Sequence, residues 1–171
     1  MIEIVLLRLV HILGATVWVG SAVFGSVILM PVLACLGPAA GPVMAGLRAR
    51  GMAAFMPTVA LLTILSGLRL MWITSGGFSS SYFATTWGAT YAASGAAAIV
   101  AFGVGMTVSR PLGMRMGALA SRLASAPDDA SRVALTAELT AVRRQNTLLT
   151  WLLGSLLIAS ASGMAVARYL G

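Results

Sequence analysis

The residues best suited to chemistry lie inside apolar segments of the chain. His11 is the only histidine, and Arg8 stands three residues before it, on the same face of a helix. Ionisable side chains are costly to place inside a membrane-spanning helix, so they are the first candidates for function. Neutral imidazole is a common axial ligand of haem iron, and arginine binds carboxylates such as the haem propionates. His11, Arg8 and Arg69 are therefore the minimum set for a b-type haem.

Two further residues are candidates for the second axial position of such a haem. Tyr91 and Met164 are expected at the same depth in the membrane as His11, and His11 of a second copy would serve equally well. Each candidate also has a structural explanation. Arg8 can extend to the lipid headgroups, His11 can be a hydrogen-bonded packing residue, and Tyr91 and Met164 can fill space between helices.

Copper is the alternative metal, because the chain has ten methionines. Thioether and thiolate ligands suit Cu(I), although methionine also fills gaps between helices. The methionines that the sequence places in one half of the membrane, together with Cys35, are Met30, Met44, Met52, Met56, Met106, Met114 and Met116.

The composition is that of a membrane protein: hydrophobic residues make up 59% of the chain and charged residues 9%. Soluble domains carry about 25% charged residues. A spanning helix needs about 20 apolar residues, and the segments of this kind are 4–36, 52–74, 87–109 and 147–169. The sequence predicts an all-α, four-transmembrane-helix bundle that forms a single domain over residues 1–171.

All eleven cationic residues are arginines, and eight of them lie in the first and third connections between these segments. This distribution is the topology signal of a membrane protein and argues against nucleic acid as a partner. Cytoplasmic loops are enriched in positive charge. The first and third connections are therefore expected in the cytoplasm, and both termini outside.

Gly37-Pro38 and Gly41-Pro42 predict a turn in the first connection, and the second connection is expected to be an uncharged Ser/Gly loop. Pro111 is expected to start or kink a helix that continues from the third span.

The third connection is expected to form a cytoplasmic helical hairpin between the third and fourth spans. Leucines at helical spacing precede the breaker Ala126-Pro127-Asp128-Asp129, and a second helix follows it. This hairpin could dock a partner or simply connect the spans. Small residues four apart predict close helix contacts, within one subunit, in a homo-oligomer or in a larger membrane complex. They are Gly88, Ala92 and Ala96 on the third span and Ser155, Ala159 and Gly163 on the fourth.

The first span resembles the opening helix of small bacterial membrane proteins related to the copper-resistance protein CopD, and of HemJ-type protoporphyrinogen oxidases. The resemblance rests on His11, on Trp18 seven residues later and on Gly20. In the second span, Pro57 and Ser66-Gly67 also resemble the CopD-like group. It implies haem b on His11 in the HemJ case, copper handling in the CopD case, and the bacterial inner membrane as the location. HemJ-type proteins carry a lysine four residues after a tryptophan, whereas Trp87 is followed there by Tyr91.

Three functions are consistent with these features. The first is a haem b-binding membrane redox protein that transfers electrons or acts as a HemJ-like oxidase. The second is a copper-handling membrane protein. The third is a non-catalytic accessory subunit of a membrane complex.

Overall fold

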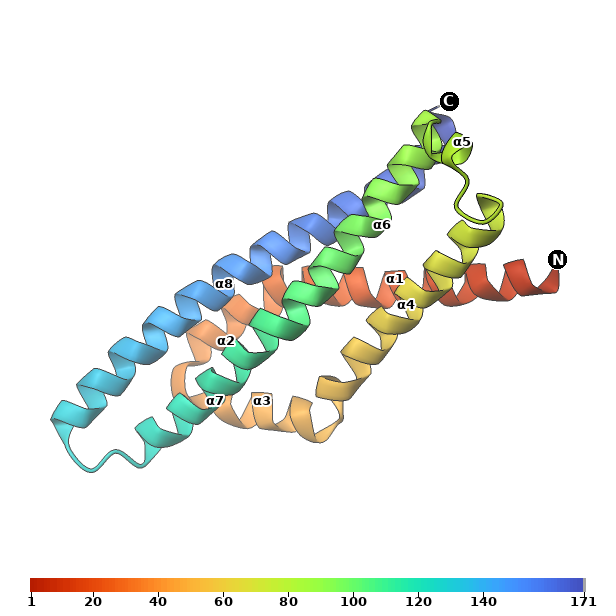
Figure 1. Ribbon diagram of the computed structural model, residues 1–171. Helices are drawn as coiled ribbons and strands as arrows, with labels where there is room; N and C mark the ends of the chain where they lie inside the picture. The colour runs from red at the N-terminus through yellow and green to blue at the C-terminus, as the bar shows by residue number, and fades with distance from the viewer. Residues whose placement is uncertain (171) are drawn as a thin grey trace.

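The computed structural model describes residues 1–170, which are helical throughout apart from short turns (Figure 1). Helix α1 (Ile2–Phe24) continues through a π-helical turn (Gly25–Leu29) into α2 (Met30–Leu36), and α6 (Thr86–Val104) continues through a second π turn (Gly105–Ser109) into α7 (Arg110–Ala124). The other helices are α3 (Ala40–Ala49), α4 (Met52–Thr74), α5 (Ser80–Phe83) and α8 (Asp129–Val166). Short 3₁₀ turns occupy Gly37–Ala39 and Ala167–Tyr169.

Four continuous helical segments are long and apolar enough to cross a membrane. They are Ile2–Leu36, Met52–Thr74, Thr86–Ala124 and Asp129–Tyr169. Most of their large apolar side chains are exposed, including Leu13, Leu65 and Leu152. The predicted all-α fold is confirmed, and so is the prediction of four helices long and apolar enough to span a membrane.

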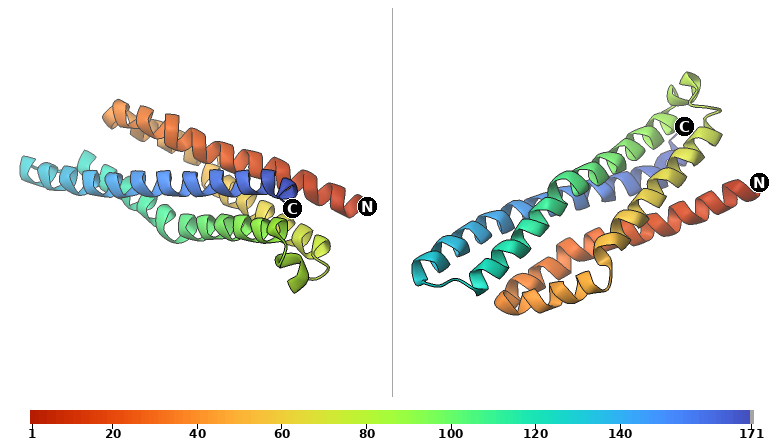
Figure 2. Two further views of the ribbon diagram at one scale, coloured as in Figure 1. Left: turned by 90° about the horizontal axis from the view of Figure 1, so that it is seen from above. Right: turned by 60° about the horizontal axis from the view of Figure 1, so that its bottom comes forward.

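The helices associate as two pairs, α1 with α4 and α6 with α8, and α1 also contacts α8 (Figures 1 and 2). One hydrogen bond to a backbone carbonyl joins α6 and α8, from the Ser160 hydroxyl to the Ser94 oxygen at 2.7 Å. The pairs also meet where the Trp18 and Phe102 rings pack edge to face, 6.3 Å between centroids. A hydrogen bond from a hydroxyl to a backbone carbonyl and a contact between two aromatic rings are thus among the interactions that hold the helices together.

Small residues set the closest approaches between helices. A Cβ added at Gly14 would overlap the Thr63 hydroxyl, and one at Gly163 would overlap the Ser94 hydroxyl. The expectation for Gly163 is therefore confirmed. On α6, Gly88 is buried and Ala92 is half-buried, as predicted, whereas Ala96 of α6 and Ser155 and Ala159 of α8 are exposed, so the prediction was wrong for these three. On α8 the buried positions are instead Gly154, Leu157 and Ser160, at a spacing of three.

Two prolines explain the two π turns. Pro31 and Pro111 each stand six residues after the glycine that begins a π turn, Gly25 or Gly105. Proline has no N–H, and its ring clashes with the carbonyl four residues before it. A single wider turn ahead of the proline accommodates that clash without ending the helix. The third span therefore continues into α7 as one helix.

The connections contain helices that the sequence did not predict. Gly41-Pro42 was expected to form a turn, but it lies in the first turn of α3, where proline needs no hydrogen-bonding N–H. The chain reverses instead at Gly37, whose φ of +54° lies in the left-handed region. Helix α5 occupies the Ser/Gly-rich second connection, which was expected to be a loop.

Helix α7 and the first part of α8 pack side by side (Figure 2). Leu119, Leu139 and Val142 form a small buried cluster between them. Asp128 caps the start of α8, and its carboxylate accepts the Ser131 N–H at 2.7 Å. These Ser131 hydrogen bonds lower the pKa of Asp128 below its usual 3.8.

Candidate functional site

His11 lies on the face of α1 that packs against α4, and its side chain is half-buried. Its Nδ1 atom is 2.8 Å from the Thr63 carbonyl oxygen of α4. A carbonyl oxygen can only accept, so Nδ1 is the donor, and in a neutral ring Nε2 is then the nitrogen with the lone pair. Metal-binding histidines are held in the same way, with one ring nitrogen donating to a carbonyl and the other free to coordinate.

Gly67 makes room for the imidazole ring. A Cβ added at Gly67 would lie 2.7 Å from His11 Cε1, 3.0 Å from Nδ1 and 3.7 Å from Nε2. Any side chain at position 67 would therefore displace the ring. The pair Ser66-Gly67 belongs to the resemblance noted in the sequence, and the structure gives Gly67 a steric role.

Arg69 is engaged by a residue that the sequence did not connect with it, Glu3. The Nε and Nη2 atoms of Arg69 each lie 2.8 Å from Glu3 Oε1. The two side chains are about half exposed, at 49% and 56%. The antiparallel register provided the signal for this pair. Because α1 and α4 are antiparallel, Glu3, which precedes His11, and Arg69, which follows Thr63, lie toward the same end of the helix pair.

Arg8 lies one turn from His11 but has a different environment. Its side chain is exposed. Within residues 1–170 the ion pairs are Arg69–Glu3 and Arg115–Glu138, so Arg8 has no carboxylate partner there. The two arginines expected to bind the haem propionates therefore differ. Arg8 has no carboxylate partner among the described residues, whereas Arg69 is already bound to Glu3.

Tyr91 and Met164 lie on the other pair of helices, α6 and α8, and both are half-buried. The Tyr91 ring packs edge to face against Trp87, with centroids 6.4 Å apart. No hydrogen bond or aromatic contact joins either residue to His11 within the described chain. Tyr91 instead ends a series of touching aromatic rings that runs from α4 through α5 to α6: Trp72, Phe78, Phe83, Tyr82, Trp87 and Tyr91.

An apolar groove runs along α1 and α4 next to this site, with a volume of about 390 Å³. Glu3 stands at its end beside Arg69, and Ser66 is its other polar residue. Its remaining lining residues are Leu6, Leu7, Val10, Leu62 and Leu65. The groove can accept an apolar group alongside the helix pair that holds His11.

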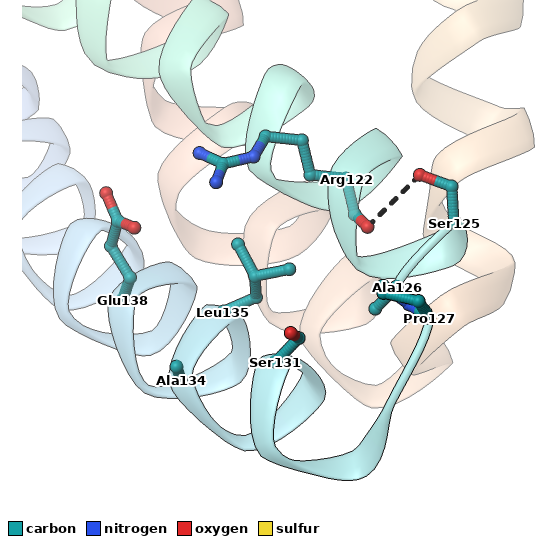
Figure 3. A pocket seen from close by; sticks show the side chains of 8 residues that line it. All are labelled: Arg122, Ser125, Ala126, Pro127, Ser131, Ala134, Leu135 and Glu138. Carbon is teal, nitrogen blue, oxygen red and sulfur yellow. Dashed lines mark hydrogen bonds between the residues drawn. The ribbon is translucent and has the colours of Figure 1, made fainter.

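A second groove, of about 430 Å³, lies at the turn between α7 and α8 (Figure 3). Arg122 and Glu138 extend on either side of Leu135, and Ser125 donates a hydrogen bond to the Arg122 carbonyl. The Glu138 carboxylate is paired with Arg115 at 2.6 Å. This groove is polar at its rim and distant along the chain from His11.

Cys35 is the one residue proposed for copper that is not a methionine. Over residues 1–170, no three His, Cys, Asp or Glu side chains gather closely enough to hold a metal ion. Cys35 is exposed on α2.

Comparison with known proteins gives no relative: no protein-family model, no curated protein and no solved structure matches this chain. The likeness of the first span to CopD-related and HemJ-type proteins therefore gains no support from these comparisons.

Proposed function

We propose that this protein is a haem b-binding membrane redox protein, with His11 as an axial ligand. The observation that carries the proposal is the hydrogen bond from His11 Nδ1 to the Thr63 carbonyl. It fixes the tautomer in which Nε2 is the available ligand atom, and Gly67 fixes the ring position. Bound haem would supply a one-electron couple between ferric and ferrous iron.

The surrounding residues fit part of this role. Arg8 is free of carboxylates among the described residues and is suited to a propionate. Arg69 already binds a carboxylate, which shows that its guanidinium is accessible to one, but a propionate there would have to replace or share Glu3. Tyr91, Met164 and a second copy's His11 remain the candidates for the other axial position.

We also propose an orientation. The arginines of α3, α7 and the start of α8 would lie in the cytoplasm of a bacterium, with both termini outside and the spans in the inner membrane. In that case the packed α7 and α8 segments form a cytoplasmic helical hairpin, and the His11 site lies toward the outer face.

The test of the haem proposal is a visible spectrum of the full chain purified after haem-supplemented expression. We expect a Soret band and reduced b-type bands, which His11→Ala abolishes. Arg8→Leu should loosen the haem, and Arg69→Leu should shift its potential. Glu3→Gln is the matched control for Arg69, because it frees the guanidinium and should tighten haem. Colourless protein, or an unchanged His11→Ala spectrum, would refute the proposal.

A non-catalytic accessory subunit is the second candidate, and the same contact favours it. A histidine whose Nδ1 donates to a carbonyl across a helix interface also serves as a purely structural link. This candidate predicts protein without a cofactor that co-purifies with a larger complex. Copper handling would instead appear as bound copper in metal analysis, lost when Met52 and Met56 are replaced by leucine.

A further inference from the structure

Arg48 of α3 occupies an unusual place on α7. Its Nη2 and Nη1 atoms lie 3.0 and 3.1 Å from the position that a Cβ of Gly117 would take. The guanidinium therefore rests directly on the backbone of α7, at a point where any larger residue would displace it. This contact joins the first and third connections, which are far apart in the sequence.

Two of the three acidic residues in this part of the chain have partners other than Arg48. Eight arginines lie in α3, α7, α8 and the residues next to them, against three carboxylates. Glu138 pairs with Arg115, and Asp128 caps α8 through Ser131. Among residues 1–170, no carboxylate pairs with Arg48. The Arg48 guanidinium is held in place but has no carboxylate partner in the described chain, so it is suited to bind an anion from outside the protein.

A second cation and an open surface lie on the same face of α7. Arg110 stands seven residues before Gly117, close to two helical turns, or about 10 Å along the axis. Gly113 lies between them, and a Cβ added there would meet nothing within 4 Å. Arg110 and the Arg48 guanidinium therefore flank a bare stretch of helix backbone that an anionic group can approach.

The position of this surface identifies the source of the anion. Arg110 directly follows the π turn Gly105–Ser109, at the end of the predicted span 87–109, and Arg48 lies four residues before Met52, where α4 begins. Both arginines thus stand where spans leave the hydrocarbon region, which is the depth of lipid phosphates. We propose that Arg48 and Arg110, with Gly113 and Gly117 between them, bind the phosphate headgroup of an anionic phospholipid. This site is separate from the haem proposal.

The probe is phosphatidylglycerol, added to the full chain in neutral detergent, with phosphatidylcholine as the uncharged comparison. Binding is followed by native mass spectrometry and by the rise in unfolding temperature. Each surface arginine contributes about fivefold to affinity for an anionic lipid. Arg48→Gln should lose more than that, because Arg48 is held in place, and Gly117→Leu should reproduce the loss without changing charge. Arg48→Lys should retain part of the binding.

Arg132→Gln is the matched control, since it removes the same charge from the same part of the protein but from the first turn of α8. It should leave phosphatidylglycerol binding nearly unchanged. Equal losses in Arg48→Gln and Arg132→Gln would overturn the site in favour of diffuse charge attraction. Glycerol 1-phosphate that stabilises the protein as well as phosphatidylglycerol would overturn the lipid as ligand. The unfolding temperature in phosphatidylcholine alone shows whether each variant is folded.

Discussion

Replacing Gly67 with alanine tests the position of the His11 ring directly. The new Cβ would lie 2.7 Å from Cε1 and 3.0 Å from Nδ1, so the ring must move away from α4. That movement breaks the 2.8 Å hydrogen bond from Nδ1 to the Thr63 carbonyl. The three side-chain atoms nearest to this methyl group all belong to His11, so the closest contacts made by the substitution are those with the histidine.

The expected size follows from three contributions. Overpacking a close contact costs about 1–3 kcal/mol. Losing a hydrogen bond between membrane helices costs about 0.6 kcal/mol. Alanine is better than glycine in a helix by about 1 kcal/mol, which offsets part of this. Gly67→Ala should therefore lower the free energy of unfolding by about 0.5–2.5 kcal/mol.

The assay is unfolding of the purified chain in mixed micelles with increasing dodecyl sulfate, followed by circular dichroism. Gly20→Ala is the control, because a Cβ at Gly20 meets nothing within 4 Å, and it should be neutral or stabilising. In a His11→Ala background the cost of Gly67→Ala should disappear. If Gly67→Ala is as harmless as Gly20→Ala, or costs the same without the imidazole, the placement of His11 against α4 is wrong.

Three further predictions concern packing, capping and topology. Gly163→Leu should weaken the α6–α8 contact far more than Leu156→Ala, measured by the same unfolding assay, because Gly163 abuts the Ser94 hydroxyl; equal tolerance would contradict it. Asp128→Ala should speed amide exchange in the first turn of α8, and Asp128→Asn should not. Because the pKa of Asp128 is lowered from 3.8, the stability that its carboxylate adds to α8 is complete above that pH and is lost as the pH falls through the folded-state value. Protection of these amides against exchange that does not fall with pH would contradict this. Reporter fusions to the C-terminus should behave as external, whereas a cytoplasmic signal would reverse the proposed orientation.

The four membrane-spanning helices were predictable because hydrophobic length is a direct consequence of bilayer thickness. The helix-breaking residues were harder to interpret. Pro111 was expected to start or kink a helix that continues from the third span, and the helix does continue. Pro42 was expected to mark a turn but lies at the start of α3. Proline lacks the N–H that donates a hydrogen bond inside a helix, but the first turn of a helix does not need that donor. Whether a proline ends a helix or begins one therefore depends on where the helix starts.

The sequence predicted which residues belong to the candidate site, but it did not predict which groups those residues contact. His11 and Arg69 do lie on one helix pair, but residue type alone does not identify Glu3 as the partner of Arg69 or the Thr63 carbonyl as the partner of His11. Both choices depend on the register between α1 and α4. Close contacts such as Gly14 with Thr63 set that register, and they cannot be recognised until two helices are known to be neighbours.

The hydrogen bond from His11 Nδ1 to the Thr63 carbonyl links α1 and α4, and under the haem proposal the same histidine is also the iron ligand. His11→Ala removes Nε2 and also breaks the link between α1 and α4, so loss of haem could follow from either change. Gly67→Ala separates the two, because it keeps the imidazole and breaks only its hydrogen bond to Thr63. A haem ligand should then show altered bands or an altered potential while haem is retained. A purely structural histidine should show the loss of stability and no spectral change.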